Sequence, residues 1–214
     1  MSMRGMLITV EGVEGSGKST QCRRLAESLR ARGLDVILTR EPDGTPMGAA
    51  IRRLFTADAP TPTPLTQVLL FMAARQQHVA EVIRPALSRG AVVLSDRYAD
   101  ATMAYQGFGQ GVDLETIRDL NALATGGLLP DLTLVLDLEP AVGMGRIRDR
   151  AHDAFEKMDL AFHRRVREGY LEIARTEKRR AVVLNADQDA DALLAAIEAA
   201  VADRLLRRES LHAG

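Results

Sequence analysis

The chain has 214 residues, of which 46% are hydrophobic and 27% are charged, with a formal net charge of −1 at pH 7. This composition is typical of globular proteins and excludes disordered, collagen-like and coiled-coil chains. The near-zero net charge gives no general attraction to nucleic acid or to a membrane surface. No run approaches the roughly 18 apolar residues of a membrane span. We therefore expect neither a nucleic-acid partner nor a membrane.

The length and the cysteine content indicate one domain in a reducing compartment. A chain of 214 residues can bury its core without a disulfide or a structural metal, so residues 1–214 are expected to form a single domain. The only cysteine, Cys22, cannot form an intramolecular disulfide. The first ten residues lack the pattern of a secretory signal, and we expect a cytoplasmic protein. The four histidines show no ligand spacing, which predicts no metal site built by the protein alone.

Five short apolar segments alternate with longer segments of helical periodicity. The predicted strands are residues 7–10, 36–39, 91–95, 132–138 and 181–184. The predicted helices are residues 19–32, 65–87, 155–178 and 189–206. Strands that alternate with helices need crossover connections, which predicts an α/β fold whose parallel sheet is covered on both faces. The glycine-rich residues 107–111 are predicted to form a flexible turn.

A phosphate-binding loop follows the first predicted strand. Residues 12–19 fit the pattern G-x-x-x-x-G-K-[ST] between a strand and a helix. Glycines let backbone N–H groups point at phosphate oxygens, and the helix adds the positive end of its dipole. Lys18 would contact the β- and γ-phosphates, and the Ser19 hydroxyl would ligate Mg²⁺. The predicted phosphate-binding residues are Gly12, Val13, Glu14, Gly15, Ser16, Gly17, Lys18, Ser19 and Thr20.

Two further strand ends carry candidates for a second anion site. Thr-Arg-Glu-Pro at residues 39–42 follows the second predicted strand, and Asp-Arg-Tyr at residues 96–98 follows the third. Parallel sheets bind ligands at the carboxyl ends of their strands, so Arg40 and Arg97 would face a phosphate acceptor. The alternative for Arg97 is a structural ion pair with Asp96 or Glu11.

Two aspartates compete to hold a metal ion. Asp96 follows four apolar residues, as a carboxylate that holds magnesium through water commonly does. Asp137 follows an even better apolar run, at residues 132–136. We favour Asp96 because its strand also delivers Arg97.

Three kinds of phosphate chemistry stay open from these residues alone. A guanine-specific GTPase is disfavoured, because neither Asn121 nor Asn185 begins an N-K-x-D motif. A kinase for a nucleotide or nucleoside would use the second anion site. An ATP-binding regulatory module would need the loop alone and would transfer no phosphate.

The chain resembles the bacterial thymidylate kinase family over nearly its whole length. The matching segments are Glu11-Gly12, Thr-Arg-Glu-Pro (39–42), Asp-Arg-Tyr (96–98), Ala-Tyr-Gln-Gly (104–107), Pro-Asp-Leu-Thr (130–133) and Arg-Glu-Gly-Tyr-Leu (167–171). The resemblance implies a three-layer P-loop NTPase fold with a five-stranded parallel sheet, a small mobile lid near residues 146–157, and a homodimer. It implies transfer of the γ-phosphoryl group of ATP to dTMP, giving dTDP and ADP with Mg²⁺, a step of dTTP biosynthesis.

The resemblance also implies roles for single residues. Arg97 would clamp the dTMP phosphate, Phe71 would stack on thymine, Arg75 would reach the carbonyl edge of the base, and Tyr105 would lie against the deoxyribose. The alternative for Phe71 is a place in the core. The implied dTMP-binding residues are Glu11, Arg40, Pro42, Phe71, Arg75, Arg97, Thr102, Tyr105 and Gln106. The attacking phosphate oxygen is already ionised near pH 7, so no catalytic base is required.

The lid is expected to supply a catalytic arginine, because residues 13–16 of the phosphate loop contain none. Arg146, Arg148 and Arg150 form a basic cluster after the fourth predicted strand. The family lid usually carries an arginine where this chain has Ala154, and we expect Arg150 or Arg148 to substitute. The implied catalytic residues are Lys18, Arg97, Arg150, Arg148 and Glu11, and the implied metal ligands are Ser19 and Asp96.

Overall fold

A single parallel sheet lies at the centre of the molecule. The computed structural model of the chain describes residues 5–56, 60–148 and 154–212. These residues contain a five-stranded sheet with the order β2-β3-β1-β4-β5, and each neighbouring pair runs parallel. The strands are β1 (Met6–Glu11), β2 (Val36–Arg40), β3 (Val92–Asp96), β4 (Leu132–Asp137) and β5 (Ala181–Asn185). Each bound lies within one residue of the predicted strand, so the predicted parallel sheet is confirmed.

The three inner strands are covered on both faces. Every residue of β1 and β3 is buried, and in β4 only Asp137 is partly exposed. The edge strands β2 and β5 are partly exposed. This burial explains why the inner strands are near-continuous apolar runs rather than alternating ones.

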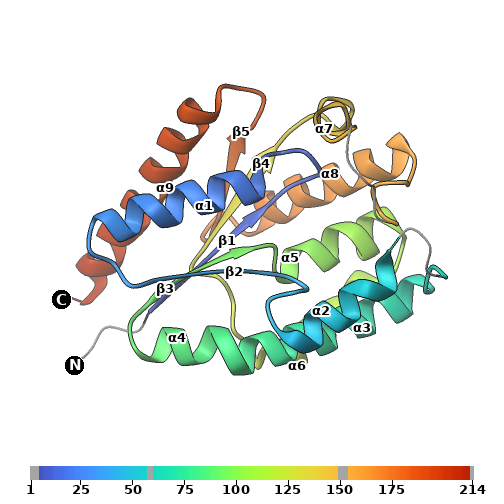
Figure 1. Cartoon of the computed structure of the whole chain (residues 1–214), viewed down its shortest axis with the longest axis horizontal. Helices are drawn as coiled ribbons and strands as arrows, with labels where there is room; N and C mark the ends of the chain where they lie inside the picture. The colour runs from blue at the N-terminus through green and yellow to red at the C-terminus, as the bar shows by residue number, and fades with distance from the viewer. Residues whose placement is uncertain (1–4, 57–59, 149–153, 213–214) are drawn as a thin grey trace.

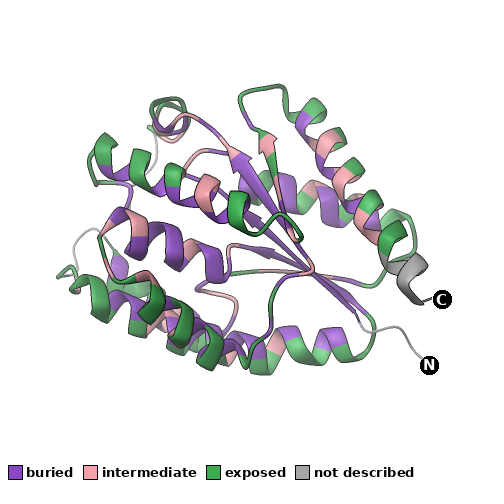
Figure 2. Ribbon diagram, turned by 180° about the vertical axis from the view of Figure 1, so that it is seen from behind, coloured by how far each residue is buried: buried purple, intermediate pink, exposed green. Residues whose placement is uncertain are grey.

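Helices cover the two faces and complete the three predicted layers (Figures 1 and 2). On one face α1 (Lys18–Ala31) packs beside α9 (Ala190–His212). The opposite face is covered by α3 (Pro64–His78) with its π-helical continuation η2 (Val79–Ile83) and α4 (Arg84–Ser88), α5 (Ala99–Thr102) with the π-helical η3 (Met103–Gly109), and α8 (Leu160–Thr176). The remaining segments are α2 (Pro46–Arg52), η1 (Arg53–Phe55), α6 (Leu114–Thr125) and α7 (Pro140–Arg146). None of the described helices is long and apolar enough to span a membrane.

Two predicted segments differ from the observed structure. The helix predicted to start at Phe155 starts at Leu160, because the Asp159 carboxylate accepts a hydrogen bond from the Phe162 backbone N–H at 2.7 Å. Such a cap fixes the first turn more strongly than apolar periodicity does. The glycine-rich residues 107–111 were predicted to be a flexible turn, but through Gly109 they belong to the buried helix η3. That prediction was wrong because η3 packs against α8.

Candidate active site

The phosphate loop connects β1 to α1 at the carboxyl edge of the sheet. The buried Lys18 ammonium donates hydrogen bonds to the carbonyl oxygens of Gly12 at 3.0 Å and Val13 at 2.7 Å. Burial, and then the nearby positive charge of Arg97, lower the pKa of Lys18. The ammonium therefore lies inside the curl of the loop, where a phosphate would meet it.

The backbone of the loop packs directly against α7. A Cβ atom on Gly15 would lie 2.1 Å from the carbonyl oxygen of Gly143, and one on Gly143 would lie 2.1 Å from the carbonyl oxygen of Glu14. Both positions therefore require glycine. Arg146, at the end of α7, donates to the carbonyl oxygen of Ala186 at 3.2 Å.

Ser19 and Asp96 lie together beside the loop. The Ser19 hydroxyl donates a hydrogen bond to the Asp96 carboxylate. The competing aspartate, Asp137, instead accepts two hydrogen bonds from Arg167 at 2.7 and 3.1 Å. Within the described part of the chain, no group of three or more His, Cys, Asp or Glu side chains is placed to hold a metal. Two oxygen donors suit Mg²⁺, which completes its coordination with phosphate oxygens and water.

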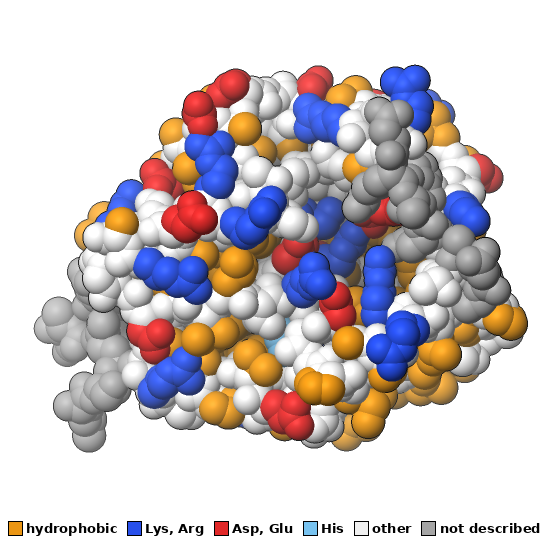
Figure 3. All heavy atoms as spheres, in the orientation of Figure 1, with side chains coloured by type: hydrophobic (Ala, Val, Ile, Leu, Met, Phe, Trp, Pro, Cys, Tyr) orange, Lys and Arg blue, Asp and Glu red, His pale blue; other side chains and the backbone are white. Residues whose placement is uncertain are grey.

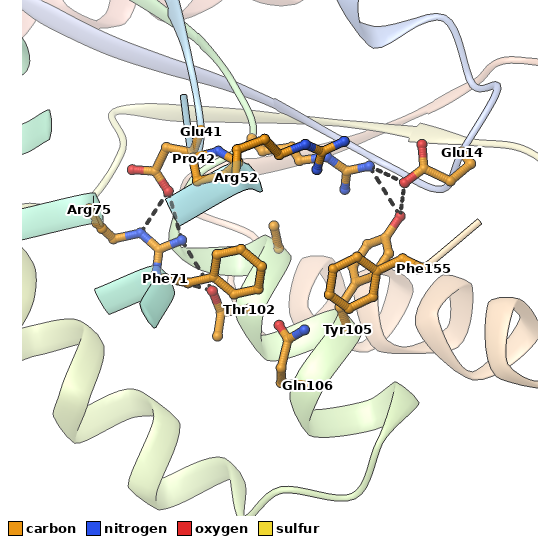
Figure 4. A pocket seen from close by; sticks show the side chains of 12 residues that line it. Glu14, Glu41, Pro42, Arg52, Phe71, Arg75, Thr102, Tyr105, Gln106 and Phe155 are labelled. Atoms are coloured by element: carbon orange, nitrogen blue, oxygen red, sulfur yellow. Dashed lines mark hydrogen bonds and ion pairs between the residues drawn. The ribbon is translucent and has the colours of Figure 1, made fainter. Parts of the chain in front are cut away.

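A pocket opens on the other side of the loop. We call it the acceptor pocket (Figure 4), and its lining residues are Glu14, Glu41, Pro42, Arg52, Phe71, Arg75, Arg97, Ala101, Thr102, Tyr105, Gln106 and Phe155. On the face seen in Figure 3, Lys and Arg side chains gather around a hollow.

Most of the residues implied to bind the acceptor meet in this pocket. Those that do are Pro42, Phe71, Arg75, Arg97, Thr102, Tyr105 and Gln106. Two others do not line it. Arg40 points to a separate cavity beside Ser19 and Asp96, where it pairs with Asp43. Glu11 is completely buried.

Aromatic rings form one wall of the acceptor pocket. The Phe71 ring stacks on Phe55, with ring centres 4.7 Å apart and planes inclined by 14°. Phe155 lies next to both rings, and its ring centre is 5.9 Å from that of Tyr105. Phe71 is only partly buried and lines the pocket, so it is anchored by the core without belonging wholly to it.

Arg75 occupies one end of the pocket and is held by several acceptors. Its guanidinium donates to the Glu41 carboxylate at 2.7 to 2.9 Å, to the Thr102 hydroxyl at 3.1 Å and to the Asn121 side chain at 2.7 Å. Burial works to raise the pKa of Glu41, but Arg75 and His78 more than offset it and hold that pKa below its ordinary value. Glu41 is therefore a carboxylate.

Arg97 occupies the other end, next to the phosphate loop. Its guanidinium pairs with the Glu14 carboxylate and lies 4.8 Å from the centre of the Tyr105 ring. Its backbone adopts the left-handed conformation, with φ of 72°. The backbone of Glu14 belongs to the phosphate loop, whereas its side chain reaches into the acceptor pocket (Figure 4). Glu14 thus joins the two sites.

Glu11 supports this end of the pocket from behind. Its carboxyl accepts hydrogen bonds from the Tyr98 backbone N–H at 2.7 Å and from the Tyr170 hydroxyl at 3.0 Å. The Tyr170 hydroxyl in turn lies 3.5 Å from the Arg97 guanidinium. Burial, and then the negative charge of Asp100, raise the pKa of Glu11 to about 8.

The Glu11→Gln variant should lose part of the pH dependence of stability. A carboxyl whose pKa rises on folding, here from 4.5 to about 8, binds more protons in the folded state between these values. The unfolding free energy therefore falls as the pH rises through this window, and the neutral glutamine removes that contribution. In urea denaturation, the free energy of unfolding should fall less between about pH 5 and about pH 8 for the variant than for the wild type. The exposed Glu168→Gln variant should follow the wild-type curve, and a Glu11→Gln curve parallel to wild type would contradict this role.

Four pocket residues were not predicted as site residues from the sequence, namely Glu41, Arg52, Ala101 and Phe155. Arg52 ends α2, a helix that was not predicted, although Thr45-Pro46 is a good start signal. The Thr45 side chain accepts a hydrogen bond from the Gly48 backbone N–H at 3.0 Å, and proline follows it at the first helical position. Of the two candidate lid arginines, Arg148 is exposed and Arg150 lies outside the described residues.

Comparisons with known proteins point to one family. The family model for thymidylate kinase matches residues 10–197. A thymidylate kinase of Deinococcus radiodurans is 50% identical over 202 residues, which cover 94% of this chain and 98% of that protein. One of Caulobacter vibrioides is 52% identical over 204 residues, with coverages of 94% and 98%. The fold is similar to the crystal structure of thymidylate kinase from Ehrlichia chaffeensis, with a TM-score of 0.77, 34% identity, and coverage of 92% of this chain and 98% of that one.

Proposed function

The chain belongs to the thymidylate kinase family, and from this premise we propose how its loop and pocket transfer the γ-phosphoryl group of ATP to dTMP, giving dTDP and ADP. The observation that carries the proposal is the position of Glu14 and Arg97. Glu14 has its backbone in the phosphate loop and its side chain in the acceptor pocket, where it pairs with Arg97. The phosphate end of the pocket is therefore adjacent to the position of the γ-phosphate.

This adjacency sets the direction in which dTMP lies. Its phosphate lies at the Arg97 end, where it replaces the Glu14 carboxylate as the partner of the guanidinium. Arg52, which lines the same pocket, adds a second positive charge. The thymine ring then reaches the Phe71 and Arg75 end, and the deoxyribose passes Tyr105.

The donor lies on the phosphate loop. Lys18 and the backbone N–H groups of the loop bind the β- and γ-phosphates. Ser19 and Asp96 are the residues that would hold Mg²⁺, which neutralises the charge of the triphosphate when it is bound. Arg148 and Arg150 are proposed to reach the γ-phosphate from the lid.

Catalysis in this arrangement consists of alignment and charge neutralisation. The acceptor phosphate, with a second pKa near 6, is ionised at neutral pH, so its oxygen attacks without a base. Arg97 holds that phosphate in line with the γ-phosphate, and Lys18 stabilises the charge that shifts toward the β-phosphate oxygens.

We also propose that the enzyme is a homodimer. Leu65 and Leu69 lie four residues apart on α3 and are 49% and 51% exposed. Leu123, on the neighbouring helix α6, is 79% exposed. Covering such side chains with a second subunit stabilises the association. A cytoplasmic location remains our expectation for the enzyme.

Release of ADP from ATP and Mg²⁺, measured with different acceptors, tests the function. The acceptors are dTMP, dUMP, dCMP, dGMP and thymidine, and a parallel reaction contains a chelator. Stimulation by dTMP that the chelator abolishes is the expected result. Stimulation by another acceptor would keep the roles of the loop and Arg97 but discard those of Phe71, Arg75 and Gln106. No stimulation by any acceptor would favour a nucleotide-binding regulatory module.

The Phe71→Ala variant should bind dTMP more weakly than ATP. Loss of base stacking should raise the KM for dTMP about tenfold, or roughly 1.4 kcal/mol. The KM for ATP should change less than about twofold, because Phe71 lies on α3 and is not part of the phosphate loop. Phe108→Ala is the matched control, since Phe108 is also partly buried but does not line the pocket. Equal rises in both KM values would make Phe71 part of the scaffold only.

A further inference from the structure

His78 lies directly behind the acceptor pocket and does not line it. It is the last residue of α3, and its side chain is 0% exposed. Both ring nitrogens have partners, because Nε2 lies 2.7 Å from the Thr39 hydroxyl and Nδ1 lies 3.2 Å from the Glu41 carboxylate. None of the roles proposed above uses this buried ring.

The partners determine which nitrogen carries the proton. A carboxylate only accepts hydrogen bonds, so Nδ1 must donate to Glu41. In the neutral ring Nε2 is then an acceptor, and the Thr39 hydroxyl donates to it. His78 therefore presents an N–H group to Glu41 in a fixed direction.

Glu41 connects His78 to the pocket. One carboxylate oxygen faces His78, and the other accepts hydrogen bonds from Arg75. Figure 4 shows Glu41 opposite Arg75, beside Phe71 and Thr102. Because one carboxylate serves both partners, a rotation that lost the His78 bond would also move the oxygen that holds Arg75.

The ring has little room to move. A Cβ atom on Gly44 would lie 2.7 Å from both Cδ2 and Nε2 of His78, so the loop after β2 packs its backbone against the imidazole. The Thr39 hydroxyl holds the same edge of the ring. This packing keeps Nδ1 directed at Glu41.

We propose that His78 is a positioning residue for recognition of the acceptor base. Through Nδ1 it fixes the Glu41 carboxylate, and through Glu41 it fixes the Arg75 guanidinium at the base end of the pocket. The inference rests on the proposed function, in which the thymine ring lies at that end. His78 itself does not touch the substrate.

Two amide variants separate this role from a purely structural one. The side-chain nitrogen of asparagine takes approximately the place of Nδ1, so His78→Asn keeps a donor for Glu41. The nitrogen of glutamine takes approximately the place of Nε2, so His78→Gln keeps the Thr39 contact and loses the Glu41 bond. His78→Gln should raise the KM for dTMP about tenfold, the effect of a lost hydrogen bond to a charged group. His78→Asn should raise it less than about threefold, and both should leave the KM for ATP within about twofold.

The experiment also measures the preference between acceptors, and it includes a control variant at a second buried histidine. The preference for dTMP over dCMP should fall in His78→Gln and persist in His78→Asn. His163→Gln is the matched control, because His163 is 1% exposed on α8 and does not line the pocket. Its KM values should equal those of the wild type. KM does not depend on the concentration of folded enzyme, so partial unfolding cannot imitate the expected result.

Several results would overturn the inference. Equal KM values for the two His78 variants, a change in kcat or thermal stability alone, or failure of both variants to fold would each assign His78 to stability. These outcomes differ from a failure of the proposed function, in which the wild-type enzyme itself would show no dTMP-dependent release of ADP.

Discussion

Lys18→Ala is expected to lower kcat by about a thousandfold, or roughly 4 kcal/mol of barrier, without unfolding the protein. The Lys18 ammonium lies in the curl of the phosphate loop, bonded to the carbonyl oxygens of Gly12 and Val13. Alanine leaves no positive charge at the position where negative charge shifts toward the β-phosphate during transfer. The measurement is release of ADP with saturating ATP and dTMP.

The fold should survive this change because the buried charge contributes little to stability. Burial lowers the pKa of Lys18, so the folded protein disfavours the charged form relative to the unfolded chain. The melting temperature should therefore stay within a few degrees of the wild-type value. The exposed Lys178→Ala variant should match the wild type in both kcat and melting temperature. A Lys18→Ala enzyme that keeps more than about a tenth of wild-type kcat would contradict the role of the loop.

Arg97→Ala and Arg97→Gly should both lose about a thousandfold in kcat/KM for dTMP, yet differ in stability. Either change removes the guanidinium that clamps the acceptor phosphate. The backbone at this position has φ of 72°, a conformation that costs alanine about 1–2 kcal/mol and costs glycine little. The free energy of unfolding, measured by urea denaturation, should therefore be about 1 kcal/mol higher for the glycine variant than for the alanine variant.

Arg175 provides the control for this comparison. It lies exposed in the last turn of α8, where the backbone is helical and glycine is less favourable than alanine by up to about 1 kcal/mol. The order of stability of the two Arg175 variants should thus be the reverse of that at Arg97. An Arg97→Ala variant as stable as Arg97→Gly would show that the left-handed backbone imposes no strain.

The sheet could be predicted closely because its inner strands are buried on both faces. A strand such as Leu132–Asp137 can be predicted without knowing which strands it pairs with, since nearly every side chain in it is apolar and buried. Helix starts were predicted less well because apolar periodicity does not mark a first turn. Asp159 and Asp113 each cap a helix through a backbone N–H bond, at 2.7 Å in both cases, and α6 was missed although Asp113 was available as a signal.

Motifs at strand ends predicted which segments meet in the site, but not where each side chain points. Arg97 leaves β3 toward the pocket, as expected from its place at a carboxyl strand end. Arg40 is paired in register with Asp96, one residue before the position equivalent to Arg97, so it faces Ser19 and Asp96, and Glu41 is the β2 counterpart that lines the pocket. The Arg40 guanidinium pairs with Asp43, in the short loop that precedes α2. Arg52 and His78 belong to none of these motifs in the sequence, so only the packed structure shows that they lie at the site.

At Gly15 and Gly143 the backbones of the phosphate loop and α7 are in direct contact, so the two segments should move together. Side chains usually separate the backbones of neighbouring segments, but neither Gly15 nor Gly143 has one. Because this contact is so close, we expect a tilt of α7 to displace the peptide of Glu14, and with it the carboxylate paired with Arg97. A movement of α7 beside the ATP site would thus also change the position of Arg97, which binds the acceptor phosphate. A small molecule that separated Gly15 from Gly143 would therefore disturb ATP binding and dTMP binding at the same time.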